Sequence, residues 1–403
     1  MNKLFNFSSL EGKIKIKHGF AFKGEYFASS GDYILLTPGN IYPDGGFKLD
    51  EPKEKYYNGE FPKSFLFEKG DLVTVMTDLT QEAIILGGAF IVPLSNKFLH
   101  NQRLGKIEII DIDELDKKFL YYCFNFEFFR GQVRGSASGT TVKHTAPERI
   151  YKCKIPLPPL PTQQRIASIL SAYDDLIEVN NQRIKLLEQT ARELYKEWFV
   201  RMRFPGYKQA KFKKGVPENW KTIAISDMVD FKMGQSPKSE FYNEDGNGLP
   251  FHQGVGNYGL RFPEHKIFCS VNGRIANEGD VLFSVRAPVG RLNIADRKLI
   301  IGRGLAALRH KKGLNSYLFY LLQNEFSKED LIGNGSIFNS VGKDELKKFK
   351  IFDVGDLAKK FNDIVEPIDK QLLVLIQQNT QLRQIRDRLL PRLISGKLEV
   401  SEL

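Results

Sequence analysis

The sequence predicts an α+β protein in which one unit, a globular part followed by a long helix, occurs twice with pseudo-twofold symmetry. First, residues 139–154 and 335–350 align position by position, so that Ile150 meets Leu346 and Lys152 meets Lys348. Second, a long helical pattern follows each copy. Third, turn signals and aromatic residues before each copy favour short strands. A period of about 200 residues far exceeds the ~20–50 of a solenoid, which indicates a duplicated domain.

The similarity between the two copies also includes residues that precede 139–154 and 335–350. The dipeptides at 70–71 and 279–280 are both Gly-Asp, and Arg103 is paired with Arg303. Within 1–155, turn signals separate short apolar runs, and a helix is expected at 115–129. In the second copy, 220–350, we expect a strand at 281–283 and a helix at 314–324.

The first long helix is predicted to follow a polyproline segment at 156–161, with Thr162 as its N-cap. It runs to about Val200 without glycine or proline, and 39 such residues would span ~58 Å, the length of a coiled coil rather than an ordinary globular helix. Its apolar residues recur every three or four positions. They are Ile166, Ile169, Tyr173, Ile177, Ile184, Leu187, Ala191, Leu194 and Trp198.

The second long helix is predicted at about 357–394, with a kink at Pro367 and Pro391 in its last turn. Its apolar positions are Ile364, Ile368, Leu372, Leu375, Leu382, Ile385, Leu389 and Leu393. Two such helices in one chain are expected to pack as an antiparallel coiled coil. The alternative is that each packs only on its own globular part. The segment between the copies, 204–221, is interpreted as a basic linker.

The bulk composition favours a polyanionic partner. The chain has 403 residues, a net charge of +11 and a pI of about 9.2. Nucleic acid is therefore expected ahead of a membrane surface, the alternative being a solvated lysine-rich surface. Three isolated cysteines form neither a metal motif nor a disulfide framework, which fits a reducing cytoplasm. No secretion signal or apolar run of membrane-spanning length is recognised.

No catalytic motif is found. The chain lacks the Asn/Asp-Pro-Pro-aromatic motif of adenine methyltransferases and the phosphate loop of ATPases. A GxGxxG sequence at 254–259 precedes a proline rather than a helix, so it is interpreted as a turn. The histidine spacing indicates no zinc site. A metal-dependent nuclease at Asp44, Glu51 and Lys53 remains as an unfavoured alternative, since proline interrupts the strand that such a site needs.

Polar residues suited to reading DNA occur instead at comparable places in both copies. Amide side chains recognise adenine, arginine recognises guanine or phosphate, and small hydroxyl-bearing loops approach phosphates. The candidates are Asn101, Gln102, Arg103, Ser136, Ser138, Thr140, His252, Gln253, Arg286, Arg303, Asn334 and Ser336.

Two long stretches of the sequence, residues 155–200 and 378–399, identify a family. They resemble the central and C-terminal shared regions of the specificity (S) subunits of type I restriction–modification systems. Residues 70–107, which include Thr77 as a further DNA-binding candidate, and 279–308 resemble two types of target recognition domain. The divisions expected are recognition domain 1 at 1–155, a central region with the first long helix at 156–203, a linker at 204–221, recognition domain 2 at 222–352, and a C-terminal region with the second long helix at 353–403.

The resemblance implies that each recognition domain reads one half of an asymmetric bipartite site in double-stranded DNA. The helices would set the spacer, and their apolar residues would form the coiled coil and dock two methyltransferase (M) subunits. Two restriction-translocase (R) subunits would complete the complex. S-adenosylmethionine would bind M, ATP and magnesium would bind R, and this chain would hold no cofactor and catalyse nothing. A free-standing DNA-binding regulator is the alternative.

One departure from the family pattern concerns the start of the second helix. Residues 352–355 read Phe-Asp-Val-Gly where the first copy has Pro-Leu-Pro-Pro. This difference leaves open how the chain enters the second helix, and with it the symmetry of M docking.

Overall fold

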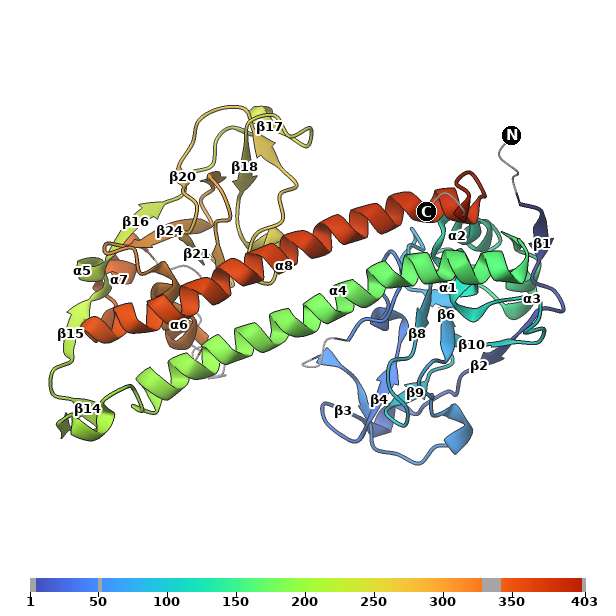
Figure 1. Ribbon diagram of the computed structural model, residues 1–403, viewed down its shortest axis with the longest axis horizontal. Helices are drawn as coiled ribbons and strands as arrows, with labels where there is room; N and C mark the ends of the chain where they lie inside the picture. The colour runs from blue at the N-terminus through green and yellow to red at the C-terminus, as the bar shows by residue number, and fades with distance from the viewer. Residues whose placement is uncertain (1–4, 50–52, 328–341, 401–403) are drawn as a thin grey trace. The chain divides into compact units, whose positions relative to one another are not determined.

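The two copies of the repeat build sheets with the same strand order. The computed structural model describes residues 5–49, 53–327 and 342–400, and the chain divides into two compact units, residues 1–177 with 381–403 and residues 178–380. Each unit contains one globular part and one portion of each of two long helices, α4 (Leu160–Tyr195) and α8 (Asp356–Ile394) (Figure 1).

The first unit is built on two four-stranded sheets. The antiparallel sheet has the order β2 (Ile14–His18), β10 (Leu104–Ile109), β6 (Leu72–Val75), β8 (Ala89–Ile91). The other has the order β3 (Phe27–Ala28), β5 (Tyr56–Tyr57), β4 (Tyr33–Leu36), β9 (Phe98–His100), with β4 and β9 parallel. Further elements are the pairs β1 (Phe7–Ser9) with β12 (Lys154–Pro156) and β7 (Thr77–Asp78) with β11 (Lys143–His144), and the α-helices α1 (Lys117–Asn125), α2 (Glu127–Gly135) and α3 (Pro147–Tyr151).

The second unit repeats this plan. Its antiparallel sheet has the order β16 (Val229–Met233), β24 (Leu305–His310), β21 (Val281–Ser284), β22 (Leu292–Ile294). Its second sheet has the order β17 (Tyr242–Asn243), β19 (Phe268–Cys269), β18 (Leu249–His252), β23 (Leu299–Ile301), β20 (Ile275–Ala276), with β18 and β23 parallel. Further elements are β15 (Lys221–Ala224) with β25 (Lys350–Asp353), β13 (Phe212–Lys213) with β14 (Val216–Pro217), and the α-helices α5 (Ile225–Met228), α6 (Asn315–Ser327) and α7 (Lys343–Lys348).

The predicted strand at 281–283 and the helix at 314–324 are thus confirmed as β21 and α6. The single helix predicted at 115–129 is wrong, because the chain breaks at Phe126 into α1 and α2. Phe126 has an extended backbone and caps both helices, which turns the chain and lets Phe124 and Phe129 pack together at 4.2 Å between ring centroids.

The strand ladders correct one pairing of the repeat. Met76 N donates to Arg103 O, and at the equivalent place Val285 N donates to Gly304 O. Arg103 is therefore equivalent to Gly304, and Arg303 to Gln102. The pairing of Arg103 with Arg303 was wrong by one residue, because it matched identical residue types, whereas the hydrogen-bond register of the strands determines which positions are equivalent.

The first long helix begins earlier than predicted. It starts at Leu160, so Thr162 lies inside the first turn rather than at the N-cap, and Thr162 N donates to Pro159 O. Proline is tolerated at the start of a helix, because the first turn has no use for its missing N–H, which explains Pro161. A π-helical turn at Lys196–Val200 follows α4.

The second long helix shares the register of the first despite its different start. Burial recurs at an offset of 195 residues, as in Ile166 and Phe361 or Ile177 and Leu372. Just before α8, where the first copy has its proline segment, the second copy has the buried residue Val354. Helix α8 continues through Pro367 as one helix.

Two positions of the predicted apolar seam are wrong. Ile364 is 48% exposed and Ile385 is 44% exposed, whereas Phe361 and Val365 are buried. Successive helical residues lie 100° apart, so a seam drawn one residue out of place points to solvent.

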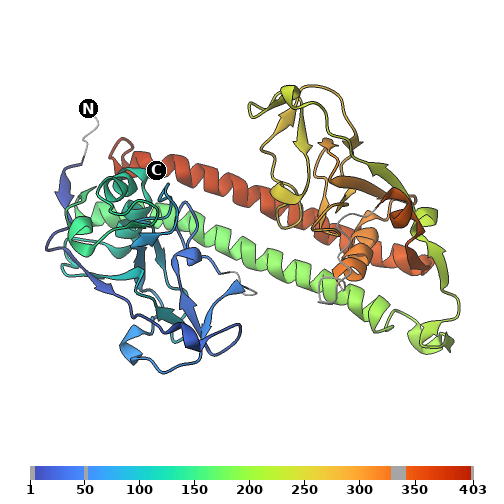
Figure 2. The ribbon, with the colours of Figure 1, turned by 180° about the vertical axis from the view of Figure 1, so that it is seen from behind.

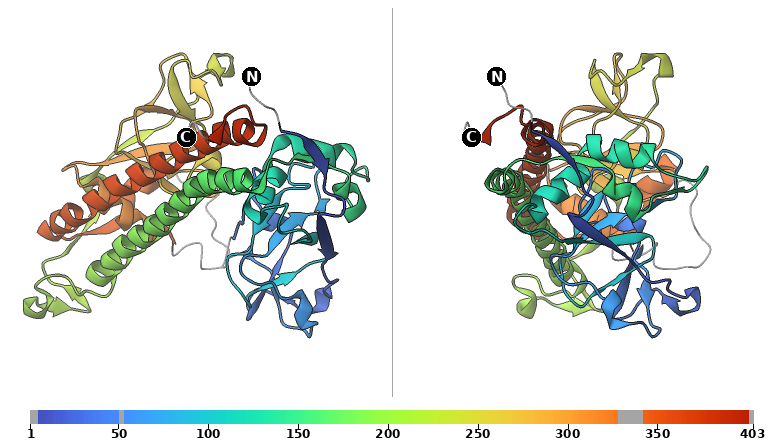
Figure 3. Two further views of the ribbon diagram at one scale, coloured as in Figure 1. Left: turned by 45° about the vertical axis from the view of Figure 1, so that its right-hand side comes forward. Right: turned by 90° about the vertical axis from the view of Figure 1, so that its right-hand side faces the viewer.

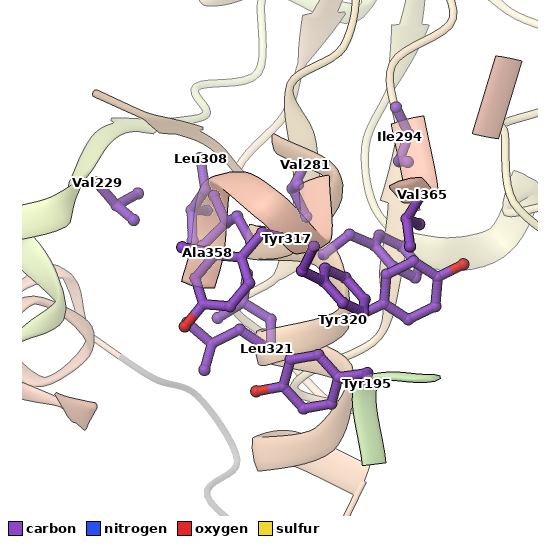
Figure 4. Close-up of a cluster of buried hydrophobic side chains, with 14 of the residues drawn as sticks. Tyr195, Val229, Val281, Ile294, Leu308, Tyr317, Tyr320, Leu321, Ala358 and Val365 are labelled. Atoms are coloured by element: carbon purple, nitrogen blue, oxygen red, sulfur yellow. The ribbon is translucent and has the colours of Figure 1, made fainter. Parts of the chain in front are cut away.

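Each unit encloses its own portion of the helices in its core. In the second unit, Tyr195 of α4, Tyr317 of α6 and Val365 of α8 gather with Val281 of β21 (Figure 4). In the first unit, Ile166 of α4 and Leu393 of α8 belong to the core formed with α1. Within each unit the two helices therefore pack together and on the globular part, with opposite chain directions (Figure 2).

The segment 204–221 is anchored to the second unit. Phe204 and Trp220 are buried in its core, 5.7 Å apart between ring centroids, while the five lysines of the segment are exposed. Among the described residues, no helix combines the length and the apolar character needed to cross a bilayer.

Candidate nucleic-acid interface

In the first unit, the backbone brings several predicted residues to one end of the sheets. Gln102 N donates to Phe20 O at 3.0 Å, Met76 N to Arg103 O at 3.0 Å, and Thr145 N to Met76 O at 3.0 Å. The segments that carry Asn101 to Arg103, Thr77 and the 136–144 hairpin therefore lie side by side. We call this the first edge.

The side chains at the first edge have different roles. Gln102 and Arg103 are exposed, so an amide and a guanidinium point to solvent together. Asn101 is half-buried, and its Oδ1 accepts from Arg103 N at 2.9 Å, which shapes the turn that presents them. Thr77 is only 6% exposed and its Oγ1 lies 3.0 Å from His144 Nδ1. Thr77 thus holds the hairpin rather than facing a ligand.

The 136–144 hairpin presents small polar groups. Ser136, Ser138 and Thr140 are exposed, and Ser138 bridges to His144 across the hairpin. Lys143 Nζ donates to Gly139 O at 2.8 Å, so an ammonium sits among the hydroxyls. Hydroxyls beside a cation are the chemistry used to contact a phosphate backbone.

The second unit has a comparable set, which we call the second edge. Ser236 Oγ donates to Gln253 Oε1 at 2.7 Å and accepts from Arg303 N at 3.2 Å. Gly304 N donates to Gln253 O at 3.1 Å, and Val285 N to Gly304 O at 2.9 Å, which brings Arg286 to the same end of the sheets. Gln253, Arg286 and Arg303 are all exposed.

His252 lies inside the second unit rather than at its surface. It is 1% exposed, its Nε2 lies 3.0 Å from His265 Nδ1, and His265 Nε2 lies 2.9 Å from Asp296 Oδ1. Burial, followed by the neighbouring His265, lowers the pKa of His252 from 6.5 to about 4. A neutral buried imidazole supports the base of the second edge and does not reach a ligand itself.

The sequence reasoning missed polar residues at the second edge. A hollow there is lined by Gln235, Ser236, Pro237, Asn272, Gly273 and Arg274. Ile301 N donates to Arg274 O at 2.8 Å, so Arg274 lies beside the segment that carries Arg303. The strand ladders were needed to find it, because nothing in the local sequence marks this arginine.

The first edge differs in chemistry at the same positions. The hydrogen bond from Phe20 N to His100 O has its equivalent in the one from Gln235 N to Ile301 O. The bridge between Leu66 and Leu99 likewise has its equivalent in the pairing of Ile275 with Ile300. Gln235 and Arg274 are thus equivalent to Phe20 and Phe65, whose rings lie 5.2 Å apart. One framework carries two different surfaces.

Three predicted residues, Asn334, Ser336 and Glu51, lie outside the described part of the chain. Asp44 Oδ2 lies 3.5 Å from Arg386 Nη2, an ion pair rather than a metal ligand. In the described ranges, no group of three or more His, Cys, Asp or Glu side chains is placed to hold a metal ion.

The predicted docking residues lie mostly within the helix seam. The buried ones are Ile166, Ile177, Ile184, Leu372 and Leu375, and the half-buried ones are Ile169, Tyr173, Leu187, Leu194, Ile368, Leu382 and Leu389. Trp198 is buried in the core of the second unit with its ring 5.9 Å from Phe361. These side chains close the helix pair, so a partner would meet other residues. In the second unit, exposed apolar side chains on the helices include Val179, Leu186 and Val374.

Comparison with known proteins places the chain among DNA specificity proteins. The sequence model described as the type I restriction modification DNA specificity domain matches residues 2–189 and 217–352. The putative type I restriction enzyme MjaX specificity subunit of Methanocaldococcus jannaschii is 32% identical over 69% of this chain and 65% of its own length. The MjaIX specificity subunit of the same organism is 27% identical over 84% of this chain and 80% of its own length.

A solved structure shares the fold. The crystal structure of the type I restriction-modification S subunit from M. genitalium matches with a TM-score of 0.64 at 18% identity. The match covers 97% of this chain and 96% of that one. The fold, with two α+β globular parts and two long helices, is therefore shared with that S subunit.

Proposed function

The chain belongs to the type I restriction modification DNA specificity family, and from that premise we propose that it selects the DNA sequence on which a type I restriction–modification complex acts. The observation that carries the proposal is the pair of edges, one on each repeat, built on the same strand order with different polar residues. A protein that recognises a single DNA sequence element would not need two such surfaces.

The proposed target is a bipartite and asymmetric site in double-stranded DNA. Gln102 and Arg103 would read one half-site, and Gln253, Arg286 and Arg303 the other. Amide and guanidinium groups form bidentate hydrogen bonds to base edges in the major groove. Lys143 and the exposed hydroxyls of the 136–144 hairpin would contact phosphates and supply salt-dependent affinity.

The two long helices are proposed to set the spacer between the half-sites. Supporting this, α4 and α8 each run without interruption from the core of one unit into the core of the other. Four residues inserted into α4 between its two cores are expected to change the spacer that the complex accepts. An unchanged spacer would remove this role.

Two M subunits are the proposed partners on the helix pair, and two R subunits would join them. The exposed apolar residues Val179 and Leu186 are seven positions apart on α4, hence on one face, and suit a helical partner. S-adenosylmethionine would bind M, and ATP with magnesium would bind R. This chain would bind no cofactor and would not catalyse methylation or cleavage.

The test is to express the chain with an adenine methyltransferase subunit from a type I system and sequence the modified adenines. We expect two half-sites separated by a fixed spacer, and Arg303→Ala should relax only one of them. Methylation without any preferred sequence would contradict the proposal. DNA binding with no co-purification of the methyltransferase would favour the free-standing regulator.

A further inference from the structure

In the first unit, a carboxylate fastens the globular part to the helix pair. Tyr122 Oη of α1 donates to Asp174 Oδ2 of α4 at 2.6 Å. Arg386 Nη1 of α8 donates to Asp174 Oδ1, also at 2.6 Å. Both the aspartate and its arginine therefore come from the helices, and the globular part adds the tyrosine. Burial and the Asp174 charge raise the pKa of Tyr122, so its hydroxyl keeps the proton that it donates.

In the second unit, the arginine comes from the other side of the contact. Arg261 is 2% exposed and lies in a loop of the globular part. Its Nη2 donates to Asp369 Oδ1 of α8 and, at 3.0 Å, to Tyr320 Oη of α6. Its guanidinium also lies 3.6 Å from the ring centroid of Phe319, a cation–π contact.

The two contacts occupy equivalent positions. Tyr122 and Tyr320 stand in helices with matching burial, where Phe119 and Leu120 correspond to Tyr317 and Leu318. Asp174 and Asp369 are related by the 195-residue offset that relates the two helices. The same offset relates Arg386 to Ala191, which is completely buried and carries no charge. The helices thus supply an arginine at one end and lack it at the other.

The missing arginine has an electrostatic consequence. Asp369 is 8% exposed, and its Oδ2 has no hydrogen-bond partner among the described residues. Burial raises the pKa of nearby Glu188 of α4, and the charge of Arg261 opposes that rise. Removing the cation from a buried ion pair costs far more than the pair itself contributes, because the remaining charge stays desolvated. Arg261 of the globular part therefore neutralises the Asp369 carboxylate, for which the helices supply no arginine.

We propose that this arginine assigns each globular part to its own end of the helix pair. The end formed with Asp369 accepts only a globular part that brings its own arginine in the loop of Arg261. The end formed with Asp174 already holds Arg386, and there the loop of the globular part offers the opposite charge, Asp44, whose carboxylate lies 3.5 Å from Arg386. Arg261 and Arg386 are positioning residues. The inference rests on the proposed function only in taking the globular parts to be the recognition domains, and it implies that their order is not freely exchangeable.

The direct test is a full-length hybrid in which residues 10–153 replace residues 225–349. The junctions are equivalent, since Leu10 N donates to Cys153 O as Ile225 N donates to Phe349 O. The hybrid brings Tyr122 to Asp369 without an arginine, so its thermal unfolding midpoint should fall several degrees below that of the parent. Ala191→Arg should restore it, because this arginine would stand where Arg386 stands in the first unit. The same substitution in the parent should not raise the midpoint, since Arg261 already occupies the site.

A hybrid as stable as the parent without Ala191→Arg, or one that Ala191→Arg does not improve, would overturn the proposal. Thermal unfolding needs no DNA and no methyltransferase. Its outcome is therefore independent of the methylation test of the proposed function.

Point variants of the natural chain keep the proposal testable if the hybrid does not fold. Arg261→Met should lower the unfolding midpoint, and adding Asp369→Asn should recover part of the loss. Without the Arg261 charge, nothing from that side chain opposes the burial that raises the pKa of Glu188. The midpoint of Arg261→Met should therefore also rise relative to the parent from about pH 7 to about pH 5, as Glu188 takes up a proton. A loss that is independent of pH and of Asp369→Asn would show that Arg261 acts by packing alone.

Discussion

Asn180 of α4 donates a hydrogen bond to Asn379 Oδ1 of α8 at 2.9 Å, between two side chains that are buried in an otherwise apolar seam. Asn180 also donates to Gln378 Oε1 at 3.1 Å, and Asn379 donates to Asn181 Oδ1 at 2.9 Å. A slip of one helix along the other would separate these amides and bury them against isoleucine or leucine. The cluster therefore selects one register of the pair.

We expect Asn180→Leu to destabilise the second unit by about 1–3 kcal/mol, because Asn379 loses a buried partner. Asn180→Leu combined with Asn379→Leu should recover most of this loss, since two apolar side chains replace two amides. Urea unfolding measures both, with the exposed Gln182→Leu as the control. A double variant no more stable than the single one would contradict the register role. If the helices set the spacer, a complex of the double variant with the M subunits should also methylate sites with a wider range of spacers.

The contact between Tyr122 and Asp174 predicts a coupled pair in the first unit. Tyr122→Phe should cost about 1–3 kcal/mol, because it leaves one oxygen of a partly buried carboxylate without its donor. In an Asp174→Asn background the same change should cost less, and the difference is the coupling energy of a double-mutant cycle. Asp175→Asn is the matched control, since Asp175 is the exposed neighbour on the same helix. Equal costs in both backgrounds would rule out the coupling.

The two edges predict half-site-specific effects on DNA reading. Arg303→Ala should cost about 1–3 kcal/mol of discrimination at one base pair of one half-site and leave the other half-site unchanged. Arg297→Ala removes the same charge from the same unit at an exposed position where Arg297 pairs with Asp296 at 3.2 Å. It should change the salt dependence of binding at most. Competitive binding to single-base variants of the methylated site measures both, and equal loss of specificity would place the reading surface elsewhere.

A buried histidine predicts a loss of stability in acid. His100 is 3% exposed, its Nε2 lies 2.9 Å from Leu104 O, and burial lowers its pKa from 6.5 to about 4. The folded protein therefore keeps His100 neutral down to about pH 4, while the unfolded chain takes up a proton near 6.5. Acidification across this window favours the unfolded chain by at most about 3 kcal/mol, at 1.36 kcal/mol per pKa unit.

The thermal unfolding midpoint of the parent should thus decrease as the pH is lowered from about 6.5 to about 4. His100→Gln can preserve the hydrogen bond to Leu104 O without titrating, so it should make the pH profile shallower in this window. His18→Gln, at an exposed position, controls for the removal of one histidine. An unchanged slope in His100→Gln would show that other groups cause the acid sensitivity.

The duplication, the fold class and the two long helices were predictable from the sequence, because periodic burial and repeated turn residues are local signals. The exposed members of the candidate edges, such as Gln102 and Gln253, were also found, since clusters of amide and guanidinium side chains can be recognised from the residue types alone. Arg274 was missed, and Thr77 and His252 proved to be buried, because exposure depends on which strand lies alongside. The one-residue error between Arg103 and Arg303 has the same origin.

By itself the sequence determined that one unit is used twice, that each unit ends in an amphipathic helix, and to which family the chain belongs. Only the tertiary structure decided which residues face solvent at the edges, which side chains fill the seam, and from which side Asp174 and Asp369 receive their arginines. Helical periodicity acts over a few neighbouring residues and is written in the local sequence. The partner of a buried charge lies about a hundred residues or more away, as with Arg261 and Asp369, and only packing brings the two together.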